Sequence, residues 1–187
     1  MRAFLAIPLR GSALAQAQEV LTRLRDHVPA VRWARPETLH VTLHFFGQLS
    51  DVDAERALAA IRPAVTRTPA IELTLDRLGA FPSRGAPRVL WLGASGESIE
   101  LSKLAVACGE ALREADFSVD ARPFRAHCTL GRPRTRWSQS AHDEWRRIRA
   151  APLTPIAFAA TQLTLFESVH AEGGNRYLER VVVPLGA

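Results

Sequence analysis

Cysteine, lysine and long apolar runs are scarce in this chain. The only cysteines are Cys108 and Cys128, which cannot form a disulfide framework and do not belong to a Cys-x-x-Cys metal or redox pair. The apolar run near the N-terminus ends at Arg10, so it is too short to cross a membrane, and it lacks a signal-peptide cleavage pattern. We therefore expect a cytoplasmic protein that does not associate with a membrane.

The composition also excludes several classes of non-globular protein. Of the 187 residues, 47% are hydrophobic and 23% are charged, while glycine and proline number only 11 and 12. These values disfavour disorder, collagen-like repeats and coiled-coil rods. The formal charge is +5, and Lys103 is the only lysine, so arginine supplies nearly all of the positive charge. Arginine binds phosphate oxygens through its planar fork, although coding bias produces the same composition.

Apolar residues alternate between strand-like and helix-like spacing along the whole chain. The helical spacing predicts four helices, over Ser12–His27, Asp51–Val65, Glu97–Ala115 and Ser140–Arg149. Strands are expected at Arg2–Leu9, Leu39–Phe46 and Phe124–Leu130. Two hairpins are expected, one from Ile71–Leu78 and Val89–Leu92, the other from Thr161–Phe166 and Tyr177–Val183 around the turn Gly173-Gly174-Asn175. No linker divides these elements, so we expect one domain over residues 1–187.

One short polar pattern occurs twice in predicted strands. The order His, apolar residue, Thr, Leu appears at residues 40–43 and again at residues 127–130. Side chains alternate between the two faces of a strand, so the His and Thr of each copy project together while the apolar residues face the core. Polar side chains on a core strand carry a burial cost unless they find partners. Two such strands that face each other would share a polar cleft, which favours a functional site.

Two imidazoles across a cleft suit general acid and base catalysis, because one ring can be neutral while the other is protonated near neutral pH. The adjacent hydroxyls of Thr42 and Thr129 can donate hydrogen bonds to oxygens that gain charge in the transition state. Such an arrangement suits phosphoryl transfer. The pattern lacks the carboxylate cluster of a magnesium site and the three or four ligands of a zinc site. We therefore predict chemistry without a metal or another cofactor.

Four segments carry a resemblance to a known family. They are residues 2–7 (RAFLAI), 39–47 (LHVTLHFFG), 87–93 (PRVLWLG) and 122–132 (RPFRAHCTLGR). The two His-x-Thr motifs and their flanks resemble the 2H phosphoesterase superfamily, specifically the bacterial and archaeal RNA 2′,3′-cyclic phosphodiesterases, also called 2′-5′ RNA ligase-like proteins. One departure is Ala126, where relatives often have proline before the second histidine.

The resemblance implies an α+β fold with two pseudo-symmetric lobes. Each lobe contributes an antiparallel sheet that faces a central cleft, and the helices lie on the outside. The implied reaction is hydrolysis of a terminal RNA 2′,3′-cyclic phosphate to a 2′-phosphate. By the same resemblance, His127 is the base that activates water and His40 is the acid that protonates the leaving 3′ oxygen. Thr42, Thr129 and Arg132 are expected to bind the phosphate oxygens.

Several neighbouring residues are weaker candidates for the cleft. Strand alternation places His44 on the same face as His40 and directs Phe45 toward the core. Aromatic side chains in this stretch, including Phe46, are candidates for stacking on a base, although the pattern favours core packing for them. Arg125 belongs to a basic neighbourhood that fits an RNA backbone; its other members are Arg122, Arg134 and Arg136. Strand alternation also turns the Cys128 thiol away from the cleft, which indicates a buried structural cysteine.

Three functions remain compatible with the sequence. The first is the cyclic phosphodiesterase, acting on RNA ends or on small cyclic nucleotides. The second is a 2′-5′ RNA ligase, and the third is a protein that binds RNA ends without catalysis. Two titratable imidazoles argue against simple binding, which does not need them. In the absence of an evident interaction helix, we expect a monomer.

Overall fold

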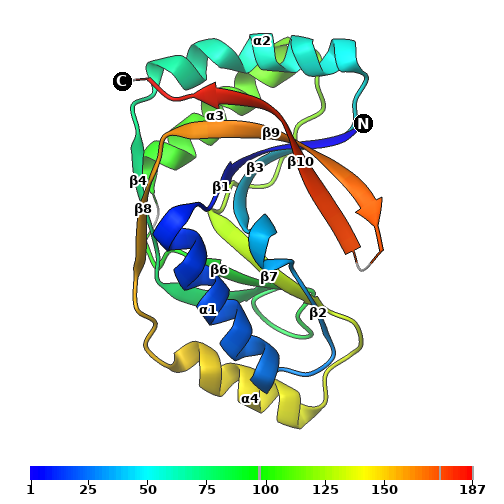
Figure 1. Ribbon diagram of the computed structural model, residues 1–187, viewed down its shortest axis with the longest axis vertical. Helices are drawn as coiled ribbons and strands as arrows, with labels where there is room; N and C mark the ends of the chain where they lie inside the picture. The colour runs from blue at the N-terminus through cyan, green and yellow to red at the C-terminus, as the bar shows by residue number, and fades with distance from the viewer. Residues whose placement is uncertain (97, 173, 187) are drawn as a thin grey trace.

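The structure, a computed structural model, describes residues 1–96, 98–172 and 174–186. Helices α2 (Asp51–Arg67) and α3 (Ile99–Glu114) lie at one end of the molecule, and α1 (Gly11–His27) and α4 (Gln139–Ala150) lie at the other (Figure 1). Strands run between the two helical ends, which gives the two-lobed α+β architecture expected from the sequence. The predicted helix start at Glu97 and the predicted turn residue Gly173 lie outside the described residues.

One long sheet passes through both lobes, and all of its strand pairs are antiparallel. In spatial order it consists of β10 (Gly174–Pro184), β9 (Gln162–Ala171), β1 (Arg2–Pro8), β3 (His40–Gln48), β7 (His127–Pro133), β6 (Val89–Gly93) and β5 (Arg77–Phe81). The short strand β2 (Val31–Trp33) pairs with the far part of β7, and the 3-10 turn η1 (Pro36–Thr38) follows it. A separate pair, β4 (Ile71–Leu75) with β8 (Ile156–Ala160), forms a second sheet.

The four predicted helices are present, and three of them begin at a serine cap. The hydroxyls of Ser50, Ser98 and Ser138 accept hydrogen bonds from backbone N–H groups three residues later. Such caps satisfy amides that have no partner within the helix. The apolar face of each helix packs on the core, as the helical spacing of the sequence predicts. None of the helices in the described residues is long and apolar enough to cross a membrane.

The order of elements repeats within the chain. The series β1, α1, β3, α2, β4, β5 is followed by β6, α3, β7, α4, β8, β9 in the same order. The pairings repeat as well, because β1 pairs with β3 as β6 pairs with β7, and β9 pairs with β1 as β5 pairs with β6. The two halves also exchange a helix. Helix α1 follows β1 but packs near β2, in the lobe that contains β7. Helix α3 follows β6 but packs against β3, in the other lobe.

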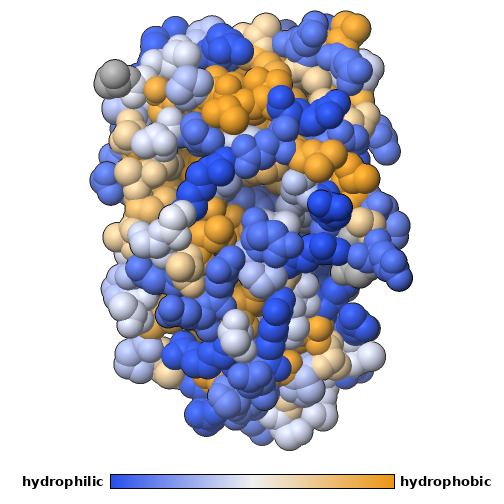
Figure 2. All heavy atoms as spheres, viewed as in Figure 1, coloured by the Kyte–Doolittle hydropathy of each residue, from blue (hydrophilic) through white to orange (hydrophobic). Residues whose placement is uncertain are grey.

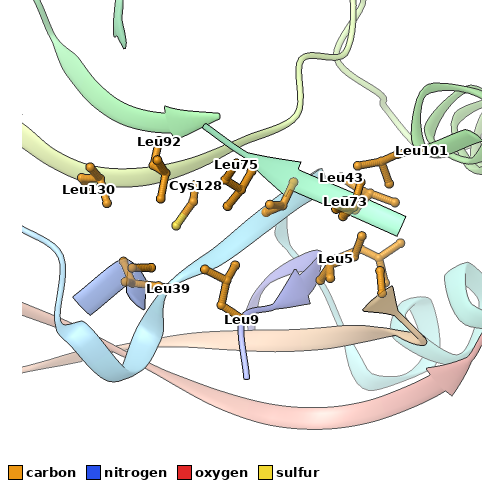
Figure 3. Packing of buried hydrophobic residues seen from close by; sticks show 14 of the residues in the cluster. Leu5, Leu9, Leu39, Leu43, Leu73, Leu75, Leu92, Leu101, Cys128 and Leu130 are labelled. Atoms are coloured by element: carbon orange, nitrogen blue, oxygen red, sulfur yellow. The ribbon is translucent and has the colours of Figure 1, made fainter. Parts of the chain in front are cut away.

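The two lobes meet at the pair of β3 and β7. The register between these strands pairs Val41 with Cys128, and both side chains are fully buried. They belong to one hydrophobic cluster that continues into both lobes. Figure 3 shows Cys128 among leucines from several segments, including Leu92 of β6 and Leu39, which immediately precedes β3. The core therefore holds the two lobes together directly beneath the repeated motifs.

The predicted strand Ile71–Leu78 is wrong in one respect, because the structure divides it into β4 and β5. Residues 71–75 pair with β8, whereas β5 pairs with β6 and forms the expected hairpin only from Arg77 onward. The chain changes sheets at Asp76, whose carboxylate accepts hydrogen bonds from the N–H and the hydroxyl of Ser95 at 2.6 Å each. The partner strand β8 was not predicted, since its sequence IAFAA offers little polar alternation.

Candidate active site

The two repeated histidines each begin a strand. His40 is the first residue of β3, His127 is the first residue of β7, and the two strands are antiparallel neighbours. Because Val41 pairs with Cys128 in antiparallel strands, the residue before each of them lies opposite the residue after the other. His40 therefore lies toward Thr129, and His127 lies toward Thr42. The structure brings the two motifs together at one place on the sheet, as their repetition in the sequence indicated.

Both imidazoles are held in the same way. Nδ1 of His40 lies 2.6 Å from the carbonyl oxygen of Thr38, and Nδ1 of His127 lies 2.7 Å from the carbonyl oxygen of Arg125. A carbonyl oxygen can only accept, so each Nδ1 carries the proton of the neutral ring. Each Nε2 then holds a lone pair and is available to a substrate. The carbonyl two residues before each histidine thus fixes both the tautomer and the ring orientation.

Aromatic rings surround each imidazole. His40 lies near Phe4, Tyr177 and Phe166, with ring-centroid distances of 4.8, 5.3 and 6.1 Å. His127 lies near Phe81 and Trp91, at 5.0 and 6.5 Å. Phe166 and Phe81 occupy equivalent places, because Phe166 pairs with Phe4, the residue before Leu5 in β1, and Phe81 pairs with Val89, the residue before Leu90 in β6. These rings limit the orientations of the imidazoles and remove water from them.

The surroundings lower the pKa of both histidines. Burial is the main cause for each, and the Nδ1 hydrogen bonds to the carbonyls of Thr38 and Arg125 oppose it only in part. The charge of His127 lowers the pKa of His40 further, and the guanidinium of Arg132 does the same for His127. Each ring is therefore within electrostatic range of another cation. A bound anion placed between them would favour protonation of one imidazole.

A bulge in β3 changes the face on which the next residues lie. Leu5 of β1 pairs with His44 and Ala6 pairs with Thr42, so Leu43 has no opposite residue. His44 consequently shares a face with buried Leu5, and its Nε2 donates to the carbonyl oxygen of Ala105 on α3 at 2.9 Å. The alternation predicted from the sequence placed His44 on the cleft face. The bulge turns it toward the core instead, and burial lowers its pKa.

The same bulge brings Phe45 to the cleft face, where the sequence pattern had directed it toward the core. Phe45 pairs with Phe4 at a ring-centroid distance of 5.8 Å, and Phe4 in turn lies against His40. Phe45 is 67% exposed, although it is a large apolar side chain. Phe46, expected as a cleft candidate, lies edge-on to Phe117 at 6.3 Å and packs beside the core.

β7 contains the equivalent bulge, which places Arg132. Trp91 of β6 pairs with Thr129 and Leu90 pairs with Gly131, so Leu130 has no opposite residue. Gly131 thus shares a face with buried Leu90, and exposed Arg132 returns to the face of Thr129. Its effect on the pKa of His127 agrees with this placement. Arg132 and Phe45 occupy equivalent positions in the two motifs, five residues after each histidine.

Two of the remaining candidates are arginines that precede β7. The side chain of Arg125 is exposed at the entry to β7, and its carbonyl orients His127. Arg122 instead forms an ion pair with Asp120. Cys128 is buried, and burial raises the pKa of its thiol to about 12, which disqualifies it as a nucleophile. Across the described ranges, no group of three or more His, Cys, Asp or Glu side chains is arranged to hold a metal ion.

Phe45 is the main residue that the sequence analysis missed. An alignment of the two internal copies, LHVTLHF and AHCTLGR, would have found it, because that alignment places Phe45 opposite Arg132. Tyr177 and the equivalent pair Phe81 and Phe166 were also missed, since they reach the histidines from strands far away in the sequence.

Comparisons with known proteins agree with this geometry. The family model of the 2′-5′ RNA ligase superfamily matches residues 12–172. An RNA 2′,3′-cyclic phosphodiesterase of Archaeoglobus fulgidus is 33% identical over 181 residues, which cover 89% of this chain and 100% of that protein. One of Geobacillus stearothermophilus is 27% identical over 165 residues, and the match covers 88% of this chain but only 51% of that relative. The chain thus spans about half the length of the second relative.

A solved structure shows the same arrangement of elements. The crystal structure of Escherichia coli LigT complexed with 3′-AMP superimposes with a TM-score of 0.79 at 27% sequence identity. The superposition covers 98% of this chain and 97% of that one. The two-lobed fold around the paired motifs is therefore shared over nearly the whole of both chains.

Proposed function

The chain belongs to the 2′-5′ RNA ligase superfamily, and from this we propose that it hydrolyses a terminal 2′,3′-cyclic phosphate of RNA to a 2′-phosphate. The observation that carries the proposal is the pair of His-x-Thr strands joined at Val41 and Cys128. Both histidines there have Nδ1 bound to a carbonyl, which leaves two Nε2 atoms for substrate. Relatives at comparable length carry the name RNA 2′,3′-cyclic phosphodiesterase, which supports the same reaction.

The phosphate is bound between the two motifs. The hydroxyls of Thr42 and Thr129 donate hydrogen bonds to its non-bridging oxygens, and the guanidinium of Arg132 adds charge-assisted bonds. These donors become more effective as negative charge builds up on the oxygens in the transition state. The equivalent places of the two threonines, one beside each histidine, support this role.

Proton transfer is divided between the two imidazoles. Neutral His127 takes a proton from water through Nε2 as the water oxygen attacks phosphorus. The bond from phosphorus to O3′ then breaks, and protonated His40 gives its Nε2 proton to the leaving oxygen. The products are a 3′-hydroxyl and a 2′-phosphate, with the proton now on His127. The guanidinium of Arg132 supports the base assignment, because it disfavours the protonated form of His127.

Phe45 supplies a place for the terminal base. Its ring packs at a tilt against Phe4, and the side chain is largely exposed on the cleft face. Stacking of a base on such a ring tolerates any sequence, because every base has a π-face. We assign Phe45 to stacking on the base of the nucleotide that carries the cyclic phosphate.

The test is incubation of the protein with an RNA that ends in a 2′,3′-cyclic phosphate, followed by identification of the product. A 2′-phosphate supports the proposal, and a 3′-phosphate would reverse which P–O bond breaks. Binding without turnover would instead support a protein that recognises RNA ends without catalysis. A 2′-5′ linkage formed with a second RNA carrying a 5′-hydroxyl would support the ligase.

A further inference from the structure

A cavity adjoins His40 on the side away from Phe45. Its volume is about 260 Å³. It lies between the end of β1, the turn η1 and strand β10, and His40 forms part of its lining. Along β3, the lining residues Thr38 and Leu39 precede His40, whereas Phe45 follows it. A nucleotide held by Phe45 and the paired motifs would therefore leave this cavity free.

Part of the cavity wall is apolar and aromatic, and the rest is polar. Tyr177 and Phe166 come from the β9–β10 hairpin, Pro8 ends β1, and Leu14 lies in the first turn of α1. Tyr177 is half-buried and stands edge-on to His40 at an interplanar angle of 86°. Flat aromatic and aliphatic walls of this kind bind planar rings. The shape and chemistry of the cavity thus fit a nucleobase better than a phosphate.

The mouth of the cavity carries mostly hydrogen-bond acceptors. Glu37 is exposed there and forms no ion pair within the part of the chain that the structure describes. Glu179 pairs with Arg10 at 2.6 Å, and both of these side chains remain about half exposed. Two carboxylates against one guanidinium disfavour an anion at this point. Figure 2 shows predominantly hydrophilic residues over the middle of this face.

Carboxylates accept hydrogen bonds from the exocyclic amino groups of bases. Adenine, cytosine and guanine each carry such a group on the edge that pairs in a duplex, whereas uracil presents one ring N–H between two carbonyls there, and these carbonyls are unfavourable beside carboxylates. Glu37 and Glu179 are placed to accept from that edge while the ring lies against Tyr177. We therefore expect the cavity to favour bases that carry an exocyclic amino group, in addition to accommodating their shape.

We propose that this cavity binds the base of the penultimate nucleotide, the one attached to the 5′ side of the terminal nucleotide. This inference rests on the proposed function and names its substrate class. The substrate is then an RNA of at least two nucleotides, preferentially with adenine, cytosine or guanine at the penultimate position. A cyclic mononucleotide fills only half of the binding surface and is a poor substrate.

The test compares kcat/KM for adenosine 2′,3′-cyclic phosphate with that for four dinucleotides NpA that end in a 2′,3′-cyclic phosphate. We expect dinucleotides with N as adenine, cytosine or guanine to exceed the mononucleotide by about tenfold or more, the usual effect of one stacked base. The uracil dinucleotide should lie between them. Equal kcat/KM for the mononucleotide and all four dinucleotides would overturn the cavity assignment and leave the proposed function intact.

Variants separate the two parts of the inference. Glu37→Ala combined with Glu179→Ala should remove the preference for amino-bearing bases over uracil, by about threefold or more, the size of one or two ordinary hydrogen bonds. Glu172→Ala is the matched control, because it removes a carboxylate near the tip of the same hairpin, outside the cavity. An unchanged preference in the double variant would overturn base recognition by these carboxylates. Failure of the wild-type protein to turn over any substrate would instead overturn the proposed function itself.

Discussion

Val41 and Cys128 pair across the junction of the two lobes, and each lies between the histidine and the threonine of its own motif. Neither side chain is exposed to solvent. The single contact therefore sets the spacing of all four polar residues on the opposite face of the sheet. Protein interiors are close-packed and deform little. The separation of the two imidazoles is consequently fixed by the core rather than by a mobile loop.

Replacement of either catalytic histidine should abolish most of the turnover. General acid or base catalysis by one side chain typically contributes about 10²- to 10⁴-fold to a rate, so His40→Ala and His127→Ala should each lose activity in that range. Neither histidine is a member of the hydrophobic core clusters, so we expect circular dichroism spectra like that of the parent protein. His27→Ala, at the exposed end of α1, is the control that keeps full activity. A wild-type rate in either catalytic variant would contradict the two-histidine mechanism.

The pH dependence follows from the direction of the pKa shifts. In the proposed mechanism, the active form carries a proton on His40 and none on His127. Burial lowers the pKa of both rings below the ordinary value of about 6.5, so free His40 loses its proton below that pH. kcat/KM reports the free enzyme, and it should reach its optimum below about pH 6.5 and decline above it. An optimum above pH 8 would show that these shifts do not control the reaction.

Arg132 offers a sharper test of the same profile. Its guanidinium lowers the pKa of His127, so Arg132→Gln should raise that pKa and move the acid limb of kcat/KM to higher pH. The rate should also fall, because a charged donor to the phosphate is lost. Arg132→Lys keeps the charge, and its acid limb should stay near that of the parent although the bidentate contact is lost. Identical acid limbs in both variants and the parent would show that Arg132 does not affect the pKa of His127.

Phe45 provides a prediction that concerns substrate binding alone. Phe45→Ala should lower kcat/KM by about tenfold or more, since stacking of one base contributes about 1–3 kcal/mol, while Phe45→Trp should retain most of it. Because the side chain is 67% exposed, the melting temperature should change little. Val52→Ala, equally exposed on α2, serves as a control for the loss of surface apolar area. Unchanged kinetics of Phe45→Ala would remove this residue from the substrate site.

Chelation and the buried thiol test the absence of other catalysts. Among the described residues no cluster is arranged to hold a metal, so turnover should be the same with and without excess chelator. Cys128→Ala should keep its catalytic rate within a few fold but lower the stability to denaturant by about 1 kcal/mol, because a buried atom is removed from the core. Inhibition by the chelator, or loss of catalysis in a folded Cys128→Ala protein, would require a different mechanism.

The sequence predicted the four helices and the meeting of His40 with His127, because helical spacing and a repeated polar pattern are local and strong signals. It mispredicted His44 and Phe45, because simple alternation assumes a continuous ladder and takes no account of the unpaired Leu43. The division of residues 71–78 between two sheets was equally hidden, since pairing partners 81 to 89 residues away decide it: Ile71 pairs with Ala160 and Leu75 with Ile156. Contacts that depend on long-range register leave little trace in local composition.

The exchange of α1 and α3 between the lobes bears on how such a chain arose. If the first half, ending with β5, existed alone, its β5 edge would lack β6 and its β1 edge would lack β9. A second copy of the same half could pair with both strand edges, and its first helix could pack where the first helix of the other copy is absent. The ancestral unit would then have been a domain-swapped homodimer with two identical motifs, one from each subunit. In the present chain the two halves are no longer identical, because one motif carries an arginine where the other carries a phenylalanine.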